Sequence, residues 1–207
     1  DYFDRLRCNK NYSLLDGIDV YREILQKHNI PSSFFVLGEI AESISSVLIE
    51  IANEDYDIGS HGWNHIRPIT IKPVEFYDEL EKSKNNLEDI ICRPIEGYRA
   101  PCFSIDRQRL DLVQKAGFSY DSSRIDFSAH PLYKTINMDG YELVRPNIFR
   151  HNDFIEFQVS TYSLFGKNIP ISGGGYLRLL PWVVSHNLIK PYLSQHELYI
   201  LYIHPFE

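Results

Sequence analysis

The stretch Phe34-Phe35-Val36-Leu37-Gly38 decides the fold, because it is a short apolar run between two segments of helical periodicity. Apolar side chains recur at helical spacing over residues 18–28 before it and over residues 44–52 after it. A second strand-like run, Asp57-Ile58-Gly59, follows. Helices that alternate with short strands predict a parallel sheet with helices packed against it.

The same alternation continues to about residue 125. A long helix is expected from Pro73, and a strand follows at Ile95-Glu96-Gly97-Tyr98. Asp106 is expected to cap the next helix, and Phe118-Ser119-Tyr120 is the next strand. The first 125 residues therefore predict an α/β fold.

Residues 126–172 break this rhythm. Asp139-Gly140 is typical of a turn between strands, and residues 154–159 alternate like a half-buried strand. We interpret this region as an antiparallel hairpin insertion within a single domain that spans residues 1–207. Beyond it, the sequence predicts a helix over residues 177–188 and a continuously apolar last strand over residues 198–203.

Composition narrows the function classes. The chain has 207 residues, 43% of them hydrophobic, and a net charge of -7. This size suits one globular domain, and the acidic balance argues against nucleic acid or an anionic membrane as a partner. No apolar stretch has the roughly 18 to 20 residues that span a bilayer. The chain starts without an initiator Met, so we expect a segment truncated at both ends; its oligomeric state is undetermined.

The sequence Ser60-His61-Gly62-Trp63-Asn64-His65 follows the strand at residues 57–59. Two imidazoles at positions i and i+4 share one face of a helical turn, so His61 and His65 could bind one divalent ion. The alternative is a pair of surface histidines in the loop between a strand and a helix.

Three more polar residues follow predicted strands: Arg99, Asp121 and His204. Each has another explanation, respectively a surface ion pair, a helix cap and a terminal turn. Side chains at the carboxyl ends of parallel strands converge on one face, however, and that face carries the site in α/β barrels. Their common placement favours a single functional site.

These residues resemble a known family. Ser60 to His65, Tyr98-Arg99-Ala100-Pro101, Tyr120-Asp121-Ser122-Ser123 and Leu201 to Pro205 resemble, in order, the second to fifth motifs of the polysaccharide deacetylases, the NodB-homology enzymes of carbohydrate esterase family 4. The resemblance implies a distorted (β/α)7-8 barrel. The ends of the chain and the Gly174 to Pro181 segment look similar to the branch encoded in bacterial exopolysaccharide loci, which leaves a cytoplasmic or a periplasmic location open.

The resemblance also implies a role for each residue. His61 and His65 would hold a divalent metal, usually zinc, together with an aspartate of the first motif. His204 would be the general acid that protonates the leaving amine. Arg99 would orient the base, and Asp121 would tune the charges around it.

For the substrate, the resemblance implies that the turn at Pro101 and Cys102 would help to hold the oxyanion, through the backbone N–H of Cys102. Cys102 stands where the family usually has a larger or hydroxylated residue.

The sequence departs from the family at its start. Of the acidic first motif only Asp1-Tyr2-Phe3 is present, so the first strand and the expected base are missing from this chain. Asp1 is either the third metal ligand or a neighbour of it.

We therefore expect a metal-dependent hydrolase that removes N-acetyl groups from N-acetylhexosamine units of a bacterial polysaccharide. One alternative is an amidase on a small cyclic or linear amide, similar to allantoinase. Another is a catalytically silent carbohydrate-binding protein, which would follow if the acidic cluster is absent from the natural protein.

Overall fold

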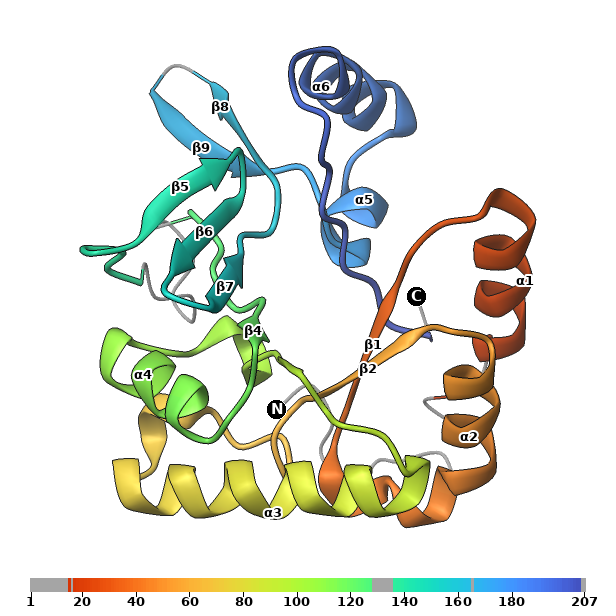
Figure 1. The fold of residues 1–207 in the computed structure, drawn as a ribbon. Helices are drawn as coiled ribbons and strands as arrows, with labels where there is room; N and C mark the ends of the chain where they lie inside the picture. Colours follow the sequence, from red (N-terminus) through yellow and green to blue (C-terminus); the bar gives the residue numbers. More distant parts are fainter. Residues whose placement is uncertain (1–14, 16, 128–135, 165, 206–207) are drawn as a thin grey trace.

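The computed structural model describes residue 15 and residues 17–127, 136–164 and 166–205 (Figure 1). Its α-helices are α1 (Ile18–His28), α2 (Ser45–Asn53), α3 (Pro73–Ile91), α4 (Arg107–Lys115), α5 (Gly174–Leu179) and α6 (Trp182–Gln195). Its strands are β1 (Ser33–Val36), β2 (Asp57–Ser60), β3 (Gly97–Tyr98), β4 (Tyr120–Asp121), β5 (Glu142–Arg145), β6 (Ile148–His151), β7 (Phe154–Phe157), β8 (Thr161–Leu164) and β9 (Lys167–Pro170).

A seven-stranded sheet in the order β1-β2-β3-β4-β7-β6-β5 organises these elements. Strands β1 to β4 are parallel, with Phe35 opposite Gly59 and Tyr98 opposite Asp121. Because helices connect these strands, the carboxyl ends of all four lie at the same edge of the sheet. The predicted α/β fold is confirmed, and each of the four helices and four strands predicted between residues 18 and 121 overlaps an observed element.

Strands β5, β6 and β7 form an antiparallel meander that extends this sheet. β7 joins it beside β4, in parallel, with Asp121 opposite Glu156. β8 and β9 form a separate antiparallel pair. Antiparallel strands expected within residues 126–172 are therefore present, and one of them, β7, adds directly to the parallel sheet.

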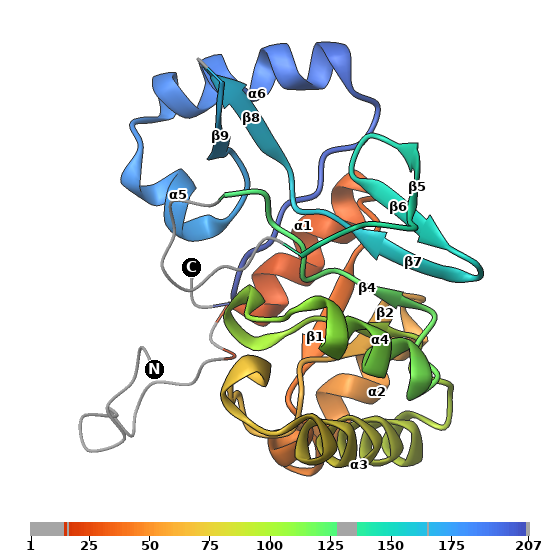
Figure 2. The same cartoon turned by 90° about the vertical axis from the view of Figure 1, so that its left-hand side faces the viewer.

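The main core lies between the first four strands and the helices α2, α3 and α4. Leu48, Leu80 and Leu110, one from each helix, are at most 1% exposed and pack with Ile95. Figure 2 shows α3 at one end of the molecule and α6 at the other. Within the described residues, no helix has the length and apolar character needed to cross a membrane.

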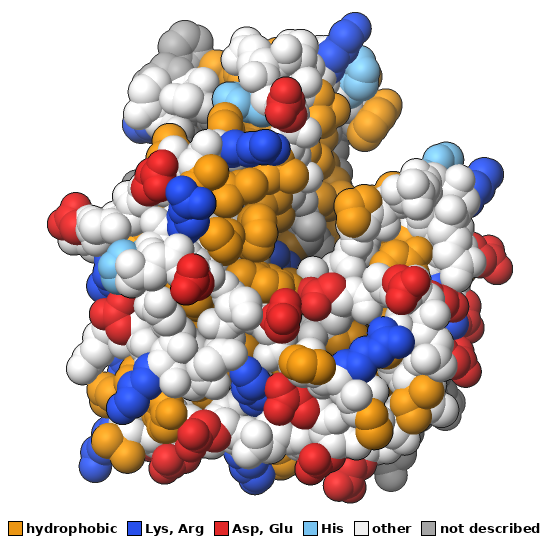
Figure 3. Space-filling model, in the orientation of Figure 1, with side chains coloured by type: hydrophobic (Ala, Val, Ile, Leu, Met, Phe, Trp, Pro, Cys, Tyr) orange, Lys and Arg blue, Asp and Glu red, His pale blue; other side chains and the backbone are white. Residues whose placement is uncertain are grey.

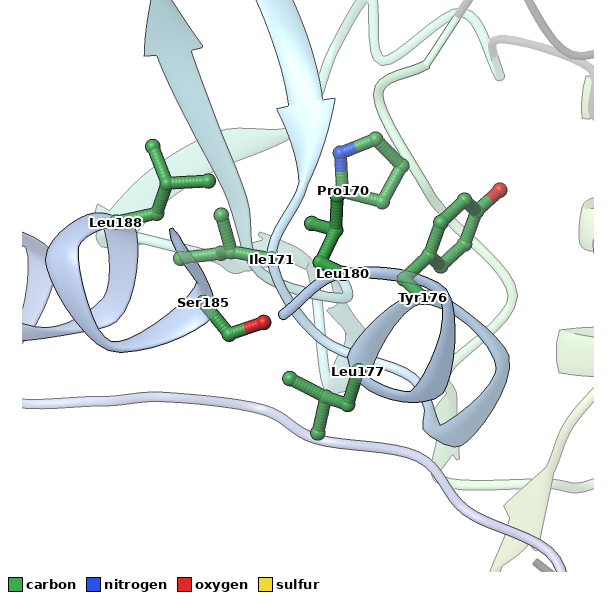
Figure 4. A pocket seen from close by; sticks show the side chains of 7 residues that line it. All are labelled: Pro170, Ile171, Tyr176, Leu177, Leu180, Ser185 and Leu188. Atoms are coloured by element: carbon green, nitrogen blue, oxygen red, sulfur yellow. The ribbon is translucent and has the colours of Figure 1, made fainter. Parts of the chain in front are cut away.

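The single helix predicted over residues 177–188 is wrong, because the chain breaks between α5 and α6. Leu180 is extended, with φ -95° and ψ 137°, and Pro181 follows it. A residue before proline avoids the helical conformation, so α5 ends there and α6 starts in a new direction. Leu177 and Leu188 then line one apolar cavity of about 10 Å³, which is too small for a ligand (Figure 4).

The strand predicted over residues 198–203 is also wrong, because these residues have no regular secondary structure. The carbonyl oxygens of Ile200 and Tyr202 accept hydrogen bonds from Ser160 and Gly174, which belong to different segments. Leu201 is 41% exposed. An apolar run becomes a strand only beside one continuous partner strand, and none of the described strands runs along this segment.

Candidate active site

His61 and His65 lie in the loop that follows β2, with their rings side by side. The ring centroids are 5.2 Å apart and the ring planes are inclined by 63°. The predicted helical turn is wrong: Gly62 has φ +81° and His65 has φ +62°, so the loop bends through left-handed conformations. The two imidazoles nevertheless lie together, as a shared metal ion would require.

The backbone fixes the orientation of the His61 ring. Its Nδ1 lies 2.7 Å from the carbonyl oxygen of Arg99. A carbonyl oxygen can only accept, so Nδ1 carries the proton and Nε2 keeps its lone pair. Metal-binding histidines are commonly held in this way, with one nitrogen donating to a carbonyl group and the other free for the metal.

The electrostatic surroundings keep both histidines neutral. Burial, followed by the charge of His65, lowers the pKa of His61 to about 3. Burial also lowers the pKa of His65. Neutral imidazole is the form that binds metal ions, so both rings are in the competent state at neutral pH.

The two histidines fit two positions of a metal site, but a complete ligand set is not visible. Among the residues that the structure describes, no group of three or more His, Cys, Asp or Glu side chains could hold a metal ion. Asp1, the predicted third ligand, lies outside the described residues. The fit therefore rests on the free Nε2 of His61 and on the adjacent ring of His65.

Arg99 follows β3 and links the ends of three strands. Its Nε donates to the Ser122 carbonyl oxygen at 2.8 Å, and its guanidinium lies 4.4 Å from the ring centre of Phe35 on β1. Burial lowers the pKa of Arg99 to about 10, against the opposing effect of Asp121, and it stays protonated at neutral pH. The site thus contains a fixed positive charge.

Asp121, at the end of β4, is completely buried and anchors the turn after β3. Its oxygens accept hydrogen bonds from the Ser123 backbone N–H at 2.8 Å and from the Ser123 hydroxyl at 2.7 Å. The Ser123 hydroxyl oxygen accepts from the Ala100 N–H at 2.8 Å. Asp121 therefore holds the backbone beside Arg99 in place through a single serine.

Pro101 and Cys102 form a short 3-10 turn directly after this anchored backbone. Cys102 has φ +55°, and no group in the described part of the chain accepts a hydrogen bond from its N–H. An unpaired N–H held by a fixed turn is able to donate to a developing negative charge. This property belongs to the backbone, so it is compatible with the cysteine side chain.

His204 reaches the same region from the C-terminal segment. The ring of Tyr202 packs against Phe103, with centroids 4.8 Å apart, and holds this segment beside the end of β3. The charge of His204 acts on both His61 and His65 and contributes to their lowered pKa values. The structure thus brings His204 into the electrostatic range of the histidine pair.

The sequence reasoning missed Glu156 on β7. This side chain is completely buried and is the register partner of Asp121. In a strand whose polar and apolar residues alternate, an acidic residue usually faces water. The alternating pattern of residues 154–159 therefore gave no sign that Glu156 is buried. Only the pairing of β4 with β7, which the local sequence does not encode, places the two carboxyl groups together.

A separate hollow lies between the hairpin strands and α6. Its volume is about 410 Å³, and most of the side chains that line it are polar. Figure 3 shows hydrophobic side chains gathered on this face of the molecule beside the strands. Its polar side chains already bind one another: Arg124 donates to Gln158 at 2.5 Å and Asn168 to Asp126 at 2.9 Å. None of the predicted site residues lines it.

Gly38 packs closely against the loop that carries His61 and His65. Its N–H donates to the Gly62 carbonyl oxygen at 2.9 Å, and a Cβ there would lie 2.6 Å from the Trp63 ring. Gly38→Ala is expected to lower the free energy of unfolding by about 1 to 3 kcal/mol, the usual effect of overpacking. Urea denaturation measures this loss. Glu39→Ala, an exposed neighbour, should change stability by less than about 0.5 kcal/mol, and equal effects would show that Gly38 has no special packing role.

Comparison with known families assigns the two halves of the chain separately. Residues 18–120 match the family model described as polysaccharide deacetylase. Residues 128–207 match a model described as a domain of unknown function (DUF3473). All described parts of the histidine and arginine motifs fall within the first match, whereas Glu156 and His204 fall within the second.

Curated relatives cover part of the chain. A peptidoglycan deacetylase of Helicobacter pylori is 28% identical over 117 residues, which are 56% of this chain and 40% of that protein. A peptidoglycan-N-acetylglucosamine deacetylase of Bacillus cereus is 35% identical over 79 residues, 38% of this chain and 26% of that protein. The matches thus span less than half the length of these relatives.

Solved structures share the fold. A Mycobacterium smegmatis protein provisionally described as a polysaccharide deacetylase aligns with a TM-score of 0.64 at 22% identity, over 93% of this chain and 65% of that one. Puue allantoinase aligns with a TM-score of 0.52 at 16% identity, over 72% of this chain and 44% of that one. At these identities the likeness concerns the fold alone.

Proposed function

Because residues 18–120 belong to the polysaccharide deacetylase family, we propose that this chain carries the active site of a metal-dependent deacetylase. The substrate we propose is a bacterial polysaccharide, from which the enzyme hydrolyses the N-acetyl groups of N-acetylhexosamine units. The observation that carries this proposal is the His61 ring, which is fixed by the Arg99 carbonyl group with Nε2 free beside His65.

His61 and His65 would hold the metal, which we propose to be zinc, with Asp1 as the third ligand. Zinc at this place would polarise the acetamide carbonyl group and make a water molecule more acidic. The chain's own contribution is to keep both imidazoles neutral and oriented before the metal binds.

The remaining groups act on the substrate. His204, in its protonated form, would donate a proton to the leaving nitrogen. The Cys102 N–H, presented by the turn at Pro101, would donate a hydrogen bond to the oxygen of the attacked carbonyl group. Arg99 and Asp121 would hold this turn and balance the charge around it.

Two observations support a polymer substrate. One is the match to the polysaccharide deacetylase family, and the other is that the curated relatives are described as peptidoglycan deacetylases. Within the family, we propose the branch encoded in exopolysaccharide loci, on the similarity of residues 174–181 and of both ends of the chain to that branch. An exopolysaccharide is therefore the substrate we place first, and peptidoglycan the second.

The test is acetate release by the full-length protein after chelation and after zinc is added back. The panel comprises an N-acetylated exopolysaccharide, peptidoglycan, an O-acetylated glycan and allantoin. We expect acetate from an N-acetylated polymer only when zinc is present. Hydrolysis of allantoin alone would indicate an amidase on small molecules, and binding of glycan without acetate release would indicate a silent carbohydrate-binding protein.

A further inference from the structure

Two buried carboxyl groups lie next to each other where β4 and β7 pair. Asp121 and Glu156 are register partners on parallel strands, so their side chains project from the same face of the sheet. Both residues have 0% of their surface exposed. Two carboxyl groups in contact and away from water do not both ionise, so one of them holds a proton at neutral pH.

The hydrogen bonds indicate which group is charged. Asp121 accepts from both the N–H and the hydroxyl of Ser123, and two donors favour the carboxylate form. Glu156 has one donor on Oε1, the Arg124 N–H at 2.8 Å. Its Oε2 is buried and has no donor in the described residues. A proton on Oε2 satisfies this atom and supplies Asp121 with a third donor.

Groups around Glu156 act on its pKa in opposite directions, and those that raise it have the larger effect. Burial, followed by the charge of Asp121 on β4, raises the pKa of Glu156 well above its usual range. Arg124 lowers it, by a smaller effect. Among the described residues, the charge of Glu156 acts in turn on Arg99, which follows β3, on Arg124, and on Tyr141, which precedes β5.

We propose that Glu156 is a positioning residue, which stays protonated at neutral pH and donates its acid proton to the Asp121 carboxylate. The pair then carries one negative charge, which balances Arg99. This role goes beyond the proposed function. Only the activity measurement described below rests on the proposed function.

The pair is connected to the histidine site by a continuous chain of hydrogen bonds. Asp121 binds Ser123, whose hydroxyl oxygen accepts from the Ala100 N–H. The preceding residue, Arg99, offers its carbonyl oxygen to His61 Nδ1. If the Asp121 carboxylate moves, the backbone that fixes the His61 ring moves with it. Glu156 thus positions His61 from a distance, without touching substrate.

The first test is independent of any enzymatic activity. An infrared spectrum of the full-length protein at pH 7 should contain the carbonyl band of one protonated carboxyl group, sensitive to deuterium exchange. Glu156→Gln should remove this band. Glu142→Gln, which changes an exposed carboxyl group on β5, should leave it unchanged.

The second test is the pH dependence of stability. A carboxyl group whose pKa is raised in the folded state stabilises the fold fully below its unfolded pKa, about 4.5 here, and this stabilisation is lost as the pH rises through the folded pKa. Relative to Glu156→Gln, the unfolding constant of the wild type should therefore increase by up to about tenfold per pH unit above pH 4.5. Glutamine is neutral and can donate to Asp121 at every pH.

Activity separates a positioning role from simple packing. Glu156→Leu has no donor and should lower kcat by roughly tenfold to a hundredfold, as for the loss of an outer hydrogen-bond partner at a metal site. Glu156→Gln should restore most of that loss. The proposal is overturned if the wild type lacks the infrared band, or if glutamine and leucine lower stability equally at every pH. Failure of acetate release in all variants would affect the proposed function, and the infrared and stability tests would still decide the role of Glu156.

Discussion

Replacing His61 with alanine is expected to abolish zinc binding and to lower turnover of the full-length protein by roughly three orders of magnitude or more, because a metal Lewis acid contributes several kcal/mol to catalysis. The ring has its Nδ1 committed to the Arg99 carbonyl oxygen and offers only Nε2, so no other atom of the residue can replace it. Zinc content after dialysis and acetate release measure the two effects.

His28→Ala is the matched control, because His28 is exposed at the end of α1 and far from the histidine loop in sequence. It should keep both zinc and activity. If His61→Ala retains stoichiometric zinc, the metal binds elsewhere, and the assignment of His61 and His65 is wrong.

Replacing His204 with alanine is expected to lower turnover by roughly two to four orders of magnitude, the usual contribution of a general acid, with unchanged zinc content. The reason is its position: it lies on the C-terminal segment, close enough for its charge to act on both site histidines. Kinetics on an N-acetylated oligosaccharide measure the effect.

Metal analysis of the same variant checks the role. Tyr202→Leu, which keeps His204 but removes the ring packed on Phe103, should reduce activity through poorer positioning and should cost less than the loss of the imidazole. Zinc lost together with His204 would make this residue a ligand and would contradict its role as the acid.

Local sequence patterns predicted the part of the fold that local physics controls. Helical periodicity located α1 to α4, and Asp106 caps α4 by accepting the Arg109 N–H, as the sequence indicated. Because the strands are parallel, residues placed after them in the sequence lie at one edge in space. This geometric rule is the reason why His61, Arg99 and Asp121 could be grouped before the structure was known.

Errors occurred where backbone geometry or distant partners decide the outcome. The left-handed residues Gly62 and His65 replace the expected helical turn, yet the two rings still meet. Pro181 divides one expected helix into two. Residues 198–203 are apolar enough for a strand but lack a continuous neighbour.

Glu156 could not be identified from the sequence, because its role depends on the pairing of β4 with β7. This pairing places Glu156 opposite Asp121, which is 35 residues earlier in the chain. From the sequence alone, an acidic residue in an alternating strand is expected to face solvent. Burial reverses that interpretation, since a carboxyl group enclosed beside another one must share a proton with it. The burial of Glu156 beside Asp121 is thus determined by the tertiary structure and not by the local sequence.

We propose that the site built on His61, His65 and His204 removes N-acetyl groups from a glycan. The most direct measurement is the stoichiometry of acetate and free amine produced by the zinc-loaded full-length protein on an N-acetylglucosamine polymer. We expect one new amine for each acetate released by the wild type, and neither product from His61→Ala. Acetate without amine would indicate ester hydrolysis, and the absence of both from the wild type on every N-acetylated glycan would contradict the claim.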